Sequence, residues 1–249
     1  MPVGSGDHWT EDYERGRPGW PHAVVEIPRL ERSEAALELA AGTGKLTRLL
    51  VGKFDSVVAV EPAEAMRRIL ISQCPGVDVR AGSAEEIPLA DASVDAVFAA
   101  EAFTHFDGKR AVAEMARVLR PDGVVVLLWN LPAGPREPSI AAVEELLNQV
   151  IERRDVKYAP LDLGPLAYTS GAWRESFTSS PFYEHQAATV ENPQTLDREG
   201  LVAFLASMGW IGDLPDSERL PLLDKVRSLL DADRYRRVWE THVQWAART

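Results

Sequence analysis

The chain has 249 residues, 27 of them basic and 38 acidic, so its formal net charge at pH 7 is −11. This charge argues against binding to nucleic acids or to anionic membranes, because phosphate contacts require a basic surface. A single cysteine, Cys74, excludes an internal disulfide, and without an apolar signal segment or a membrane-spanning apolar run the sequence predicts a cytoplasmic protein.

Residues 1–28 are polar and contain aromatic, glycine and proline residues without a visible period. Composition alone therefore predicts a loose N-terminal arm. The density of aromatic side chains indicates that part of this arm packs, and one place for it is over a ligand.

A strand, a glycine turn and a helix follow one another in the next segment. The apolar run Ala35–Leu39 predicts a buried strand, and the spacing of Leu46, Leu49 and Leu50 predicts a helix. Between them lies Gly42-Thr43-Gly44. Such a turn leaves free backbone N–H groups at the start of the helix, and a ligand can approach them closely. The segment therefore predicts a nucleotide-type site.

Three kinds of ligand compete for this turn. A phosphate-binding P-loop is excluded, because Leu39 occupies its first glycine position and Leu46 follows Lys45. A dinucleotide site is weakened, because Thr47 replaces the third glycine. S-adenosylmethionine has no phosphate, and the acidic Glu38 just before the turn suits its cationic amino group.

The second strand ends in an acidic residue at an informative distance from the turn. Ser56–Val60 reads as a buried strand and is followed by Glu61-Pro62, with Glu61 placed 19 residues after Gly42. In dinucleotide-type folds an acidic residue about 20 positions on accepts hydrogen bonds from ribose hydroxyls. We expect this role for Glu61, and Met66 marks the helix that follows.

Strands and helices continue to alternate up to residue 130. Further strands are predicted at Val77–Ala81, Val94–Ala99 and Val124–Trp129, with Asp107 as the cap of a helix. This alternation predicts a parallel sheet with helices on both faces, and ligands bind at the carboxyl ends of such strands. The residues expected to meet at that edge are Gly42, Glu61, Ser83, Glu101 and Asn130.

The alternation of strands and helices ends after the fifth predicted strand. Residues 131–180 predict an insertion that begins with a helix and continues irregularly through Tyr158 and Trp173. A strand is expected at Phe182–Val190, then two helices, and a last strand at Val238–Trp245.

Taken together, these motifs resemble the class I S-adenosylmethionine-dependent methyltransferases. Leu37-Glu38-Leu39-Ala40-Ala41-Gly42-Thr43-Gly44 is similar to their first motif, and Val60-Glu61-Pro62 to their ribose motif. Gly82–Pro88 is similar to their adenine-side loop, with Ser83 in place of the usual aspartate. Tyr13–Pro18 and Glu101–Asp107 resemble the small-molecule branch that includes the trans-aconitate-type enzymes, with Thr104 in place of a usual histidine.

The resemblance implies a single α/β domain over residues 1–249. Its sheet would be doubly wound and seven-stranded, mostly parallel with an antiparallel last strand. It implies S-adenosylmethionine as cofactor and no metal. The cofactor-binding residues that it implies are Tyr13, Arg17, Glu38, Ala40, Gly42, Thr43, Gly44, Glu61, Pro62, Met66, Ser83, Ala84, Glu85 and Glu101.

Methyl transfer from a sulfonium requires mainly an aligned acceptor and the exclusion of water. A base is needed only for a protic acceptor, and His105 and Glu101 are the catalytic candidates. We expect residues 1–28 and 131–180 to form a lid over the strand ends, with Tyr13, Arg17, Trp20 and Trp173 facing the ligands. The expected partner is a small-molecule acceptor, and an oligomer is possible.

Two other functions stay open on the sequence alone. A non-catalytic S-adenosylmethionine-binding protein would use the same cofactor residues. A nicotinamide-dependent oxidoreductase would also use a glycine turn, although the missing third glycine speaks against it.

Overall fold

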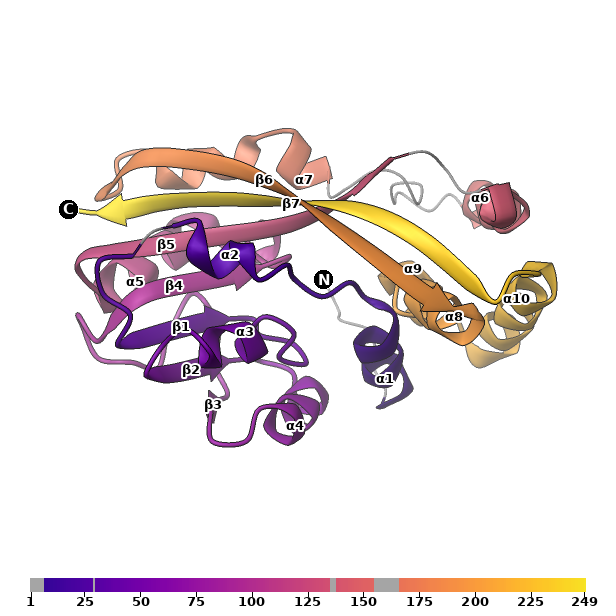
Figure 1. The fold of residues 1–249 in the computed structure, drawn as a ribbon, viewed down its shortest axis with the longest axis horizontal. Coiled ribbons are helices and arrows are strands. Elements are labelled where there is room, and N and C mark those ends of the chain that lie inside the picture. The colour runs from indigo at the N-terminus through magenta and orange to yellow at the C-terminus, as the bar shows by residue number, and fades with distance from the viewer. Residues whose placement is uncertain (1–6, 29, 135–137, 155–165) are drawn as a thin grey trace. The chain divides into compact units, whose positions relative to one another are not determined.

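The computed structural model describes residues 7–28, 30–134, 138–154 and 166–249 (Figure 1). Tyr158 and the remainder of 155–165 lie outside the described residues. The chain forms two compact units. The helical unit comprises residues 1–18, 131–165 and 192–240, and the sheet unit comprises 19–130, 166–191 and 241–249.

A seven-stranded sheet has the strand order β3-β2-β1-β4-β5-β7-β6. Its first five strands in this order are parallel, and β7 runs opposite to its neighbours (Figure 1). The predicted α/β fold with an antiparallel last strand is therefore confirmed. The strands are β1 (Ala35–Leu39), β2 (Ser56–Val60), β3 (Asp78–Arg80), β4 (Val94–Ala100), β5 (Leu119–Ala133), β6 (Phe182–Asp197) and β7 (Arg234–Arg248).

The helices alternate with the parallel strands, as the sequence predicted. The α-helices are α1 (Asp7–Gly16), α2 (Ala23–Glu26), α3 (Thr47–Val51), α4 (Glu64–Gln73), α5 (Gly108–Val118), α6 (Ala141–Arg154), α7 (Leu166–Thr169), α8 (Arg198–Ala206), α9 (Gly209–Gly212) and α10 (Asp216–Leu229). The 3-10 turns are η1 (Phe103–His105), η2 (Pro138–Ile140) and η3 (Ala172–Phe177).

One face of the sheet packs against α2 and α3. Val25 of α2 and Leu50 of α3 belong to the same buried cluster as Phe98 of β4 and Leu128 of β5. Trp20 is partly buried against this cluster, so its ring contributes to the core of the sheet unit. These apolar contacts fix α3, which begins just after the glycine turn.

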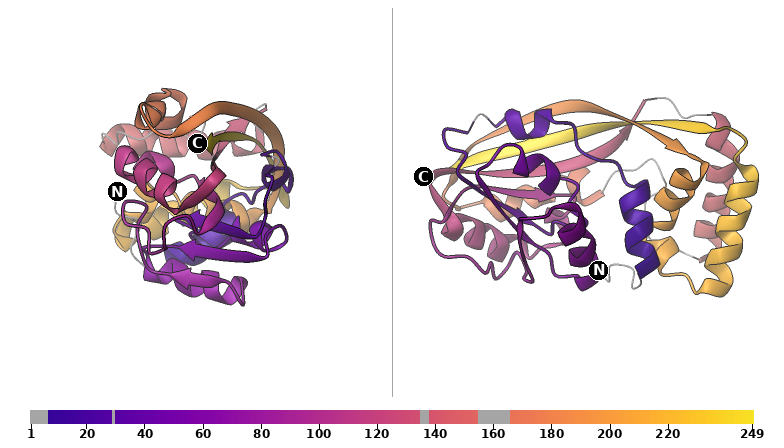
Figure 2. Two further views of the ribbon diagram at one scale, coloured as in Figure 1. Left: turned by 90° about the vertical axis from the view of Figure 1, so that its left-hand side faces the viewer. Right: turned by 60° about the horizontal axis from the view of Figure 1, so that its bottom comes forward.

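The opposite face carries a cluster of aromatic rings. Successive strand residues point to opposite faces, so Trp129 lies across the sheet from Leu128. Its ring stacks on Tyr168 of α7 at 4.4 Å and lies 5.3 Å from Trp173 of η3. η3 in turn packs on α5, as the two further views in Figure 2 help to follow. Helices therefore cover both faces, which is the doubly wound arrangement.

The helical unit has its own apolar core. Leu147 of α6, Leu205 of α8, Ile211 of α9 and Val226 of α10 are all buried in it. Tyr235, near the start of β7, is also buried in this cluster. The two predicted C-terminal helices are confirmed as α8 and α10.

The N-terminal segment differs from the predicted loose arm, because residues 7–16 form the helix α1. Its Trp9 and Tyr13 are four residues apart and their rings lie 5.5 Å from each other. Gly16 at its end packs directly on the backbone of α8, and its carbonyl accepts a hydrogen bond from Gln194 at 2.9 Å. Among the described residues, no helix is long and apolar enough to cross a membrane.

The contact at Gly16 makes a specific prediction about stability. A Cβ at this position would lie 2.1 Å from the Phe204 nitrogen and 2.6 Å from the Ala203 carbonyl carbon, and neither backbone atom can move cheaply. We expect Gly16→Ala to lower the free energy of unfolding by about 1–3 kcal/mol through overpacking. Gly19→Ala is the matched control, because nothing lies within 4 Å of its added Cβ. Equal urea midpoints for the two variants would contradict the packing of α1 on α8.

Candidate functional site

The turn after β1 has an unusual backbone. Ala40, Gly42 and Gly44 all have positive φ values, of 51°, 59° and 86°. The Gly44 N–H donates to the Ala41 carbonyl at 3.0 Å, which closes the turn before α3. A left-handed alanine costs free energy, and such residues cluster at functional sites. The geometry therefore agrees with a binding turn at the carboxyl end of β1.

Glu61 lies at the end of the neighbouring strand and reaches this turn. Its Oε2 accepts a hydrogen bond from the Gly42 N–H at 2.9 Å, and its Oε1 accepts one from the Ala63 N–H at 2.8 Å. The residue is only 5% exposed, and burial raises its pKa although both amide hydrogen bonds oppose this. Gly42 and Glu61, which the sequence places 19 residues apart, are thus in direct contact.

A second buried carboxyl group lies below the turn. Glu38 is 2% exposed, and its Oε2 accepts a hydrogen bond from the Thr47 hydroxyl at 2.5 Å. Burial raises the pKa of Glu38 to about 8, with a smaller contribution from the neighbouring Glu61 carboxylate. Thr47 occupies the third glycine position of the dinucleotide motif, and here it donates a hydrogen bond to the buried Glu38. This role was not predicted from the sequence, although a hydroxyl-bearing residue nine positions after Glu38 could have indicated it.

The reason that the sequence analysis gave for Gly44 is wrong. We expected its missing side chain to leave room for a ligand. A Cβ on Gly44 would instead lie 3.0 Å from the Cys74 Sγ and 3.2 Å from Leu70 Cγ, which belong to the α4 region. Glycine is needed here for the positive φ and for close packing of α4 against the turn.

The end of β4 provides another polar group. Glu101 has a φ of 56°, and its Oε1 accepts a hydrogen bond from the Asn130 N–H at 2.6 Å. Asn130 is buried, and its side-chain oxygen accepts a hydrogen bond from Thr241 of β7 at 2.5 Å. The Glu101 carboxylate is thus held at the carboxyl edges of β4 and β5, as the strand pattern predicted. Thr241 was not foreseen as a member of this group.

His105 ends η1, four residues after Glu101. It remains exposed to solvent, and desolvation by the protein atoms around its ring lowers its pKa. A lowered pKa favours the neutral imidazole at pH 7, which is the form that accepts a proton. Both candidate bases therefore lie in the segment that follows β4.

The residues after β3 form the next part of this edge. Ser83 pairs with Glu86 in an isolated bridge, and Ala84 is buried. Glu85 accepts a hydrogen bond from the Asp107 N–H at 2.9 Å, so it connects this loop to the start of α5. In α4, Met66 is buried, whereas Pro62 before the helix is exposed.

The expected lid residues lie in different parts of the fold. Tyr13 and Arg17 belong to the helical unit, where Arg17 Nε donates to the Ser207 hydroxyl at 2.8 Å. Trp173 belongs to the sheet unit and is buried among aromatic rings. The lid over the strand ends, including the cofactor contacts of Tyr13 and Arg17, stays a prediction.

The hydrogen-bonding groups at the turn discriminate between cofactor classes. Two buried acidic side chains, Glu38 and Glu61, flank the glycine turn, and Glu61 already occupies the Gly42 N–H. A pyrophosphate needs free N–H donors and positive potential, so this arrangement opposes it. Ribose hydroxyls and an ammonium group are hydrogen-bond donors and suit the oxygen acceptors of Glu61 and Glu38, although the Glu38 carboxyl is largely uncharged at pH 7. The buried Thr43 hydroxyl also has no hydrogen-bond partner among the described residues. S-adenosylmethionine therefore fits these residues better than a dinucleotide does.

Comparisons with known proteins agree with this choice. The family described as methyltransferase domain matches residues 37–127. An uncharacterized methyltransferase of Mycobacterium tuberculosis is 37% identical over 219 residues, which cover 88% of this chain and 82% of the relative. The chain belongs to the class I S-adenosylmethionine-dependent methyltransferases.

More distant members of the methyltransferase family support the assignment. An uncharacterized methyltransferase of Schizosaccharomyces pombe is 32% identical over 225 residues, covering 88% of this chain and 83% of the relative. A solved structure described as a type II methyltransferase from Anaeromyxobacter dehalogenans superposes with a TM-score of 0.70. It is 24% identical and covers 93% of this methyltransferase and 97% of its own chain, so it supports the fold.

The buried carboxyl of Glu38 predicts a pH-dependent stability. In the unfolded chain Glu38 loses its proton near pH 4.5, whereas in the folded methyltransferase it keeps the proton up to about pH 8. The folded state binds more protons within this window, so the contribution of Glu38 to stability is fully present below pH 4.5 and is lost as the pH rises towards 8. The slope reaches at most about 1.4 kcal/mol per pH unit for one proton.

Glu38→Gln removes this proton while keeping the shape of the neutral acid. We expect the variant to gain stability relative to the wild type as the pH rises from 5 to 8, measured by urea unfolding. Glu64→Gln is the control, because Glu64 is an exposed residue of α4. Parallel pH profiles for Glu38→Gln and the wild type would show that Glu38 is ionised in the fold.

Proposed function

We propose that this methyltransferase binds S-adenosylmethionine at the glycine turn and methylates a small-molecule acceptor. The observation that supports the cofactor site best is the meeting of Glu61 with Gly42 across the ends of β2 and β1, at 2.9 Å. Glu61 is the residue positioned to accept hydrogen bonds from ribose hydroxyls. Glu38, which is largely uncharged at pH 7 because burial raises its pKa to about 8, would offer an ammonium a carboxyl oxygen as hydrogen-bond acceptor. Bound S-adenosylmethionine supplies an electrophilic methyl group on its sulfonium.

The residues of the chain have three tasks in this proposal. The turn and Glu61 bind and orient the cofactor. Glu101, which Asn130 holds in place, lies at the adjacent strand ends and would orient the acceptor. For a protic acceptor, the neutral ring of His105 would take up the proton that the acceptor loses.

The net charge of the chain indicates the class of methyl acceptor. A net charge of −11 opposes binding to nucleic acids and anionic surfaces, which favours a small molecule. Turnover can be followed without knowing the acceptor in advance. Production of S-adenosylhomocysteine is measured with a panel of small carboxylic acids, phenols and amines, with transfer RNA as the opposing substrate. Turnover with transfer RNA alone would contradict the acceptor class.

Glu61 provides the direct test of cofactor binding. We expect Glu61→Gln to weaken binding of S-adenosylhomocysteine by about 1.5–3 kcal/mol, the usual size of hydrogen bonds to a charged group, which is about tenfold to a hundredfold in Kd. Isothermal titration calorimetry measures the loss, with Glu64→Gln as the control. If both variants bind like the wild type, Glu61 does not hold the ribose.

A further inference from the structure

The loop that joins β3 to β4 has little regular structure of its own. Parallel strands are usually joined through a helix, but residues 81–93 contain only the isolated bridge between Ser83 and Glu86. Such a loop must be held by contacts with the surrounding fold, because its backbone groups are not paired in a helix or a sheet.

This loop lies directly beside the proposed ribose carboxylate. The Glu61 N–H donates to the Arg80 carbonyl at 3.0 Å, so the end of β3 adjoins the end of β2. A Cβ on Gly82 would lie 3.1 Å from both Val60 and Pro88, which shows how closely the loop approaches β2. A nucleoside that extends from the glycine turn across Glu61 therefore reaches this loop with its base.

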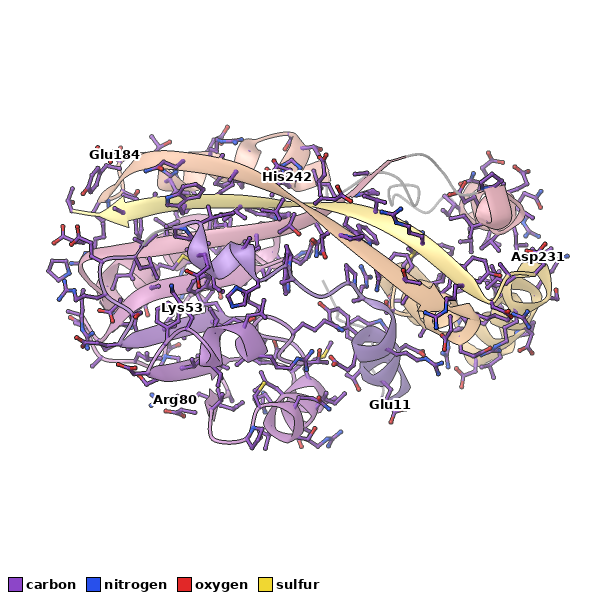
Figure 3. All side chains as sticks on the ribbon, viewed as in Figure 1. Glu11, Lys53, Arg80, Glu184, Asp231 and His242 are labelled. Atoms are coloured by element: carbon purple, nitrogen blue, oxygen red, sulfur yellow. The ribbon has the colours of Figure 1, made fainter. Side chains whose placement is uncertain are left out.

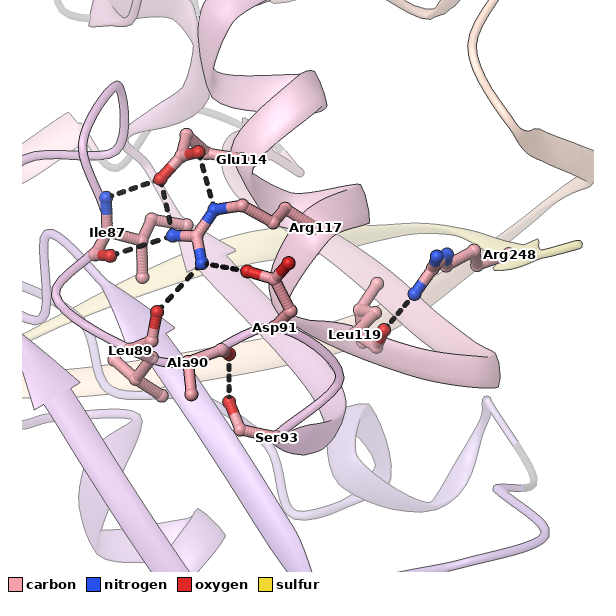
Figure 4. A network of polar contacts seen from close by, with 9 residues as sticks. All are labelled: Ile87, Leu89, Ala90, Asp91, Ser93, Glu114, Arg117, Leu119 and Arg248. Atoms are coloured by element: carbon pink, nitrogen blue, oxygen red, sulfur yellow. Dashed lines mark hydrogen bonds and ion pairs between the residues drawn. The ribbon is translucent and has the colours of Figure 1, made fainter.

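Arg117 of α5 binds the loop and the neighbouring Glu114 through its guanidinium group (Figure 4). Nη2 donates to the Ile87 carbonyl at 2.9 Å, and Nη1 donates to the Leu89 carbonyl and the Asp91 carboxylate at 2.8 Å each. Nε and Nη2 donate to the two oxygens of Glu114 at 2.7 Å. A guanidinium has five N–H donors, so all five are used.

Glu114 completes this connection from the same face of α5. Its Oε2 also accepts a hydrogen bond from the Ile87 N–H at 2.8 Å, so both backbone groups of Ile87 are bound to the Arg117–Glu114 pair. Near the other end of the helix, Glu85 binds the Asp107 N–H at 2.9 Å. At the end of β3, Arg80 donates to the Pro88 carbonyl, and Figure 3 shows the place of Arg80 in the fold.

We infer that Arg117 is a positioning residue that fixes the loop after β3 as a preformed recognition surface for the adenine base. The inference rests on the proposed function and extends it to a residue that need not contact the cofactor. The physical reason is entropy. A loop without regular secondary structure loses conformational entropy when it is ordered to recognise a planar base. Arg117 donates three hydrogen bonds to this loop and Glu114 accepts a fourth, so most of that entropy is already lost before the ligand binds.

Arg120 provides a matched control for this inference. It lies three residues further along, and its side chain is 28% exposed compared with 31% for Arg117. It also binds two acidic residues, Asp95 at 2.8 Å and Glu34 at 3.2 Å. Those partners lie at the beginnings of β4 and β1, at the opposite edge of the sheet. Replacing Arg120 therefore removes two ion pairs, as replacing Arg117 does, but it leaves the contacts of the loop after β3 intact.

The first measurement is the affinity for S-adenosylhomocysteine by calorimetry. Arg117→Ala and Arg117→Lys are expected to raise its Kd at least tenfold, because a lysine cannot reproduce the planar set of donors. Arg120→Ala is expected to change the Kd less than twofold. Glu114→Gln keeps the helix and the arginine, and it is expected to raise the Kd by an intermediate factor. It replaces Arg117→Ala in this test if that variant does not fold. Wild-type affinity in folded Arg117→Lys and Glu114→Gln would overturn the inference.

The second measurement separates positioning from general destabilisation. S-inosylhomocysteine differs from S-adenosylhomocysteine only in the base, so the ratio of their Kd values reports on base recognition. We expect the ratio to fall at least fivefold in the Arg117 variants and to stay unchanged in Arg120→Ala. An unchanged ratio in the Arg117 variants, or no preference in the wild type, would refute the role. Failure of the wild type to bind S-adenosylhomocysteine would instead refute the proposed function.

Discussion

The hydrogen bond between the Glu61 carboxylate and the Gly42 amide is the constraint on which the site depends. It joins the turn after β1 to the end of β2 at 2.9 Å, in a place where the carboxylate is almost fully buried. A buried carboxylate requires hydrogen-bond donors, and two backbone amides provide them. The same two amides fix the direction of the carboxylate, so the polar edge of the sheet is organised before any ligand arrives.

Acidic groups set the chemical character of this edge. Glu38 lies beneath the turn with a pKa of about 8, and Glu101 lies at the end of β4 with a backbone in the left-handed region. Carboxyl groups at these positions favour a ligand that is rich in hydrogen-bond donors and oppose a pyrophosphate. The methyltransferase family, established by comparison, agrees with this electrostatic choice among cofactor classes.

α5 links the packing of the sheet unit to the shape of its ligand edge. Its apolar side chains Val112 and Met115 are buried, and its polar face presents Glu114 and Arg117 to the loop after β3. One helix therefore contributes to the core and holds a loop that has almost no regular structure. A change in α5 that spares the core can still change this loop.

The sequence by itself determined the strand and helix order, the turn at Gly42 and Gly44, the position of Glu61 at the end of the second strand, and Asp107 as a helix cap. These features depend on local apolar periodicity and on fixed spacings along the chain. Tertiary structure alone decided the rest: Thr47 binds Glu38, Thr241 holds Asn130 from 111 residues away, α1 packs on α8, and Arg117 binds the loop. Their partners are brought together only by folding, because a hydrogen bond between distant segments leaves no period in the sequence.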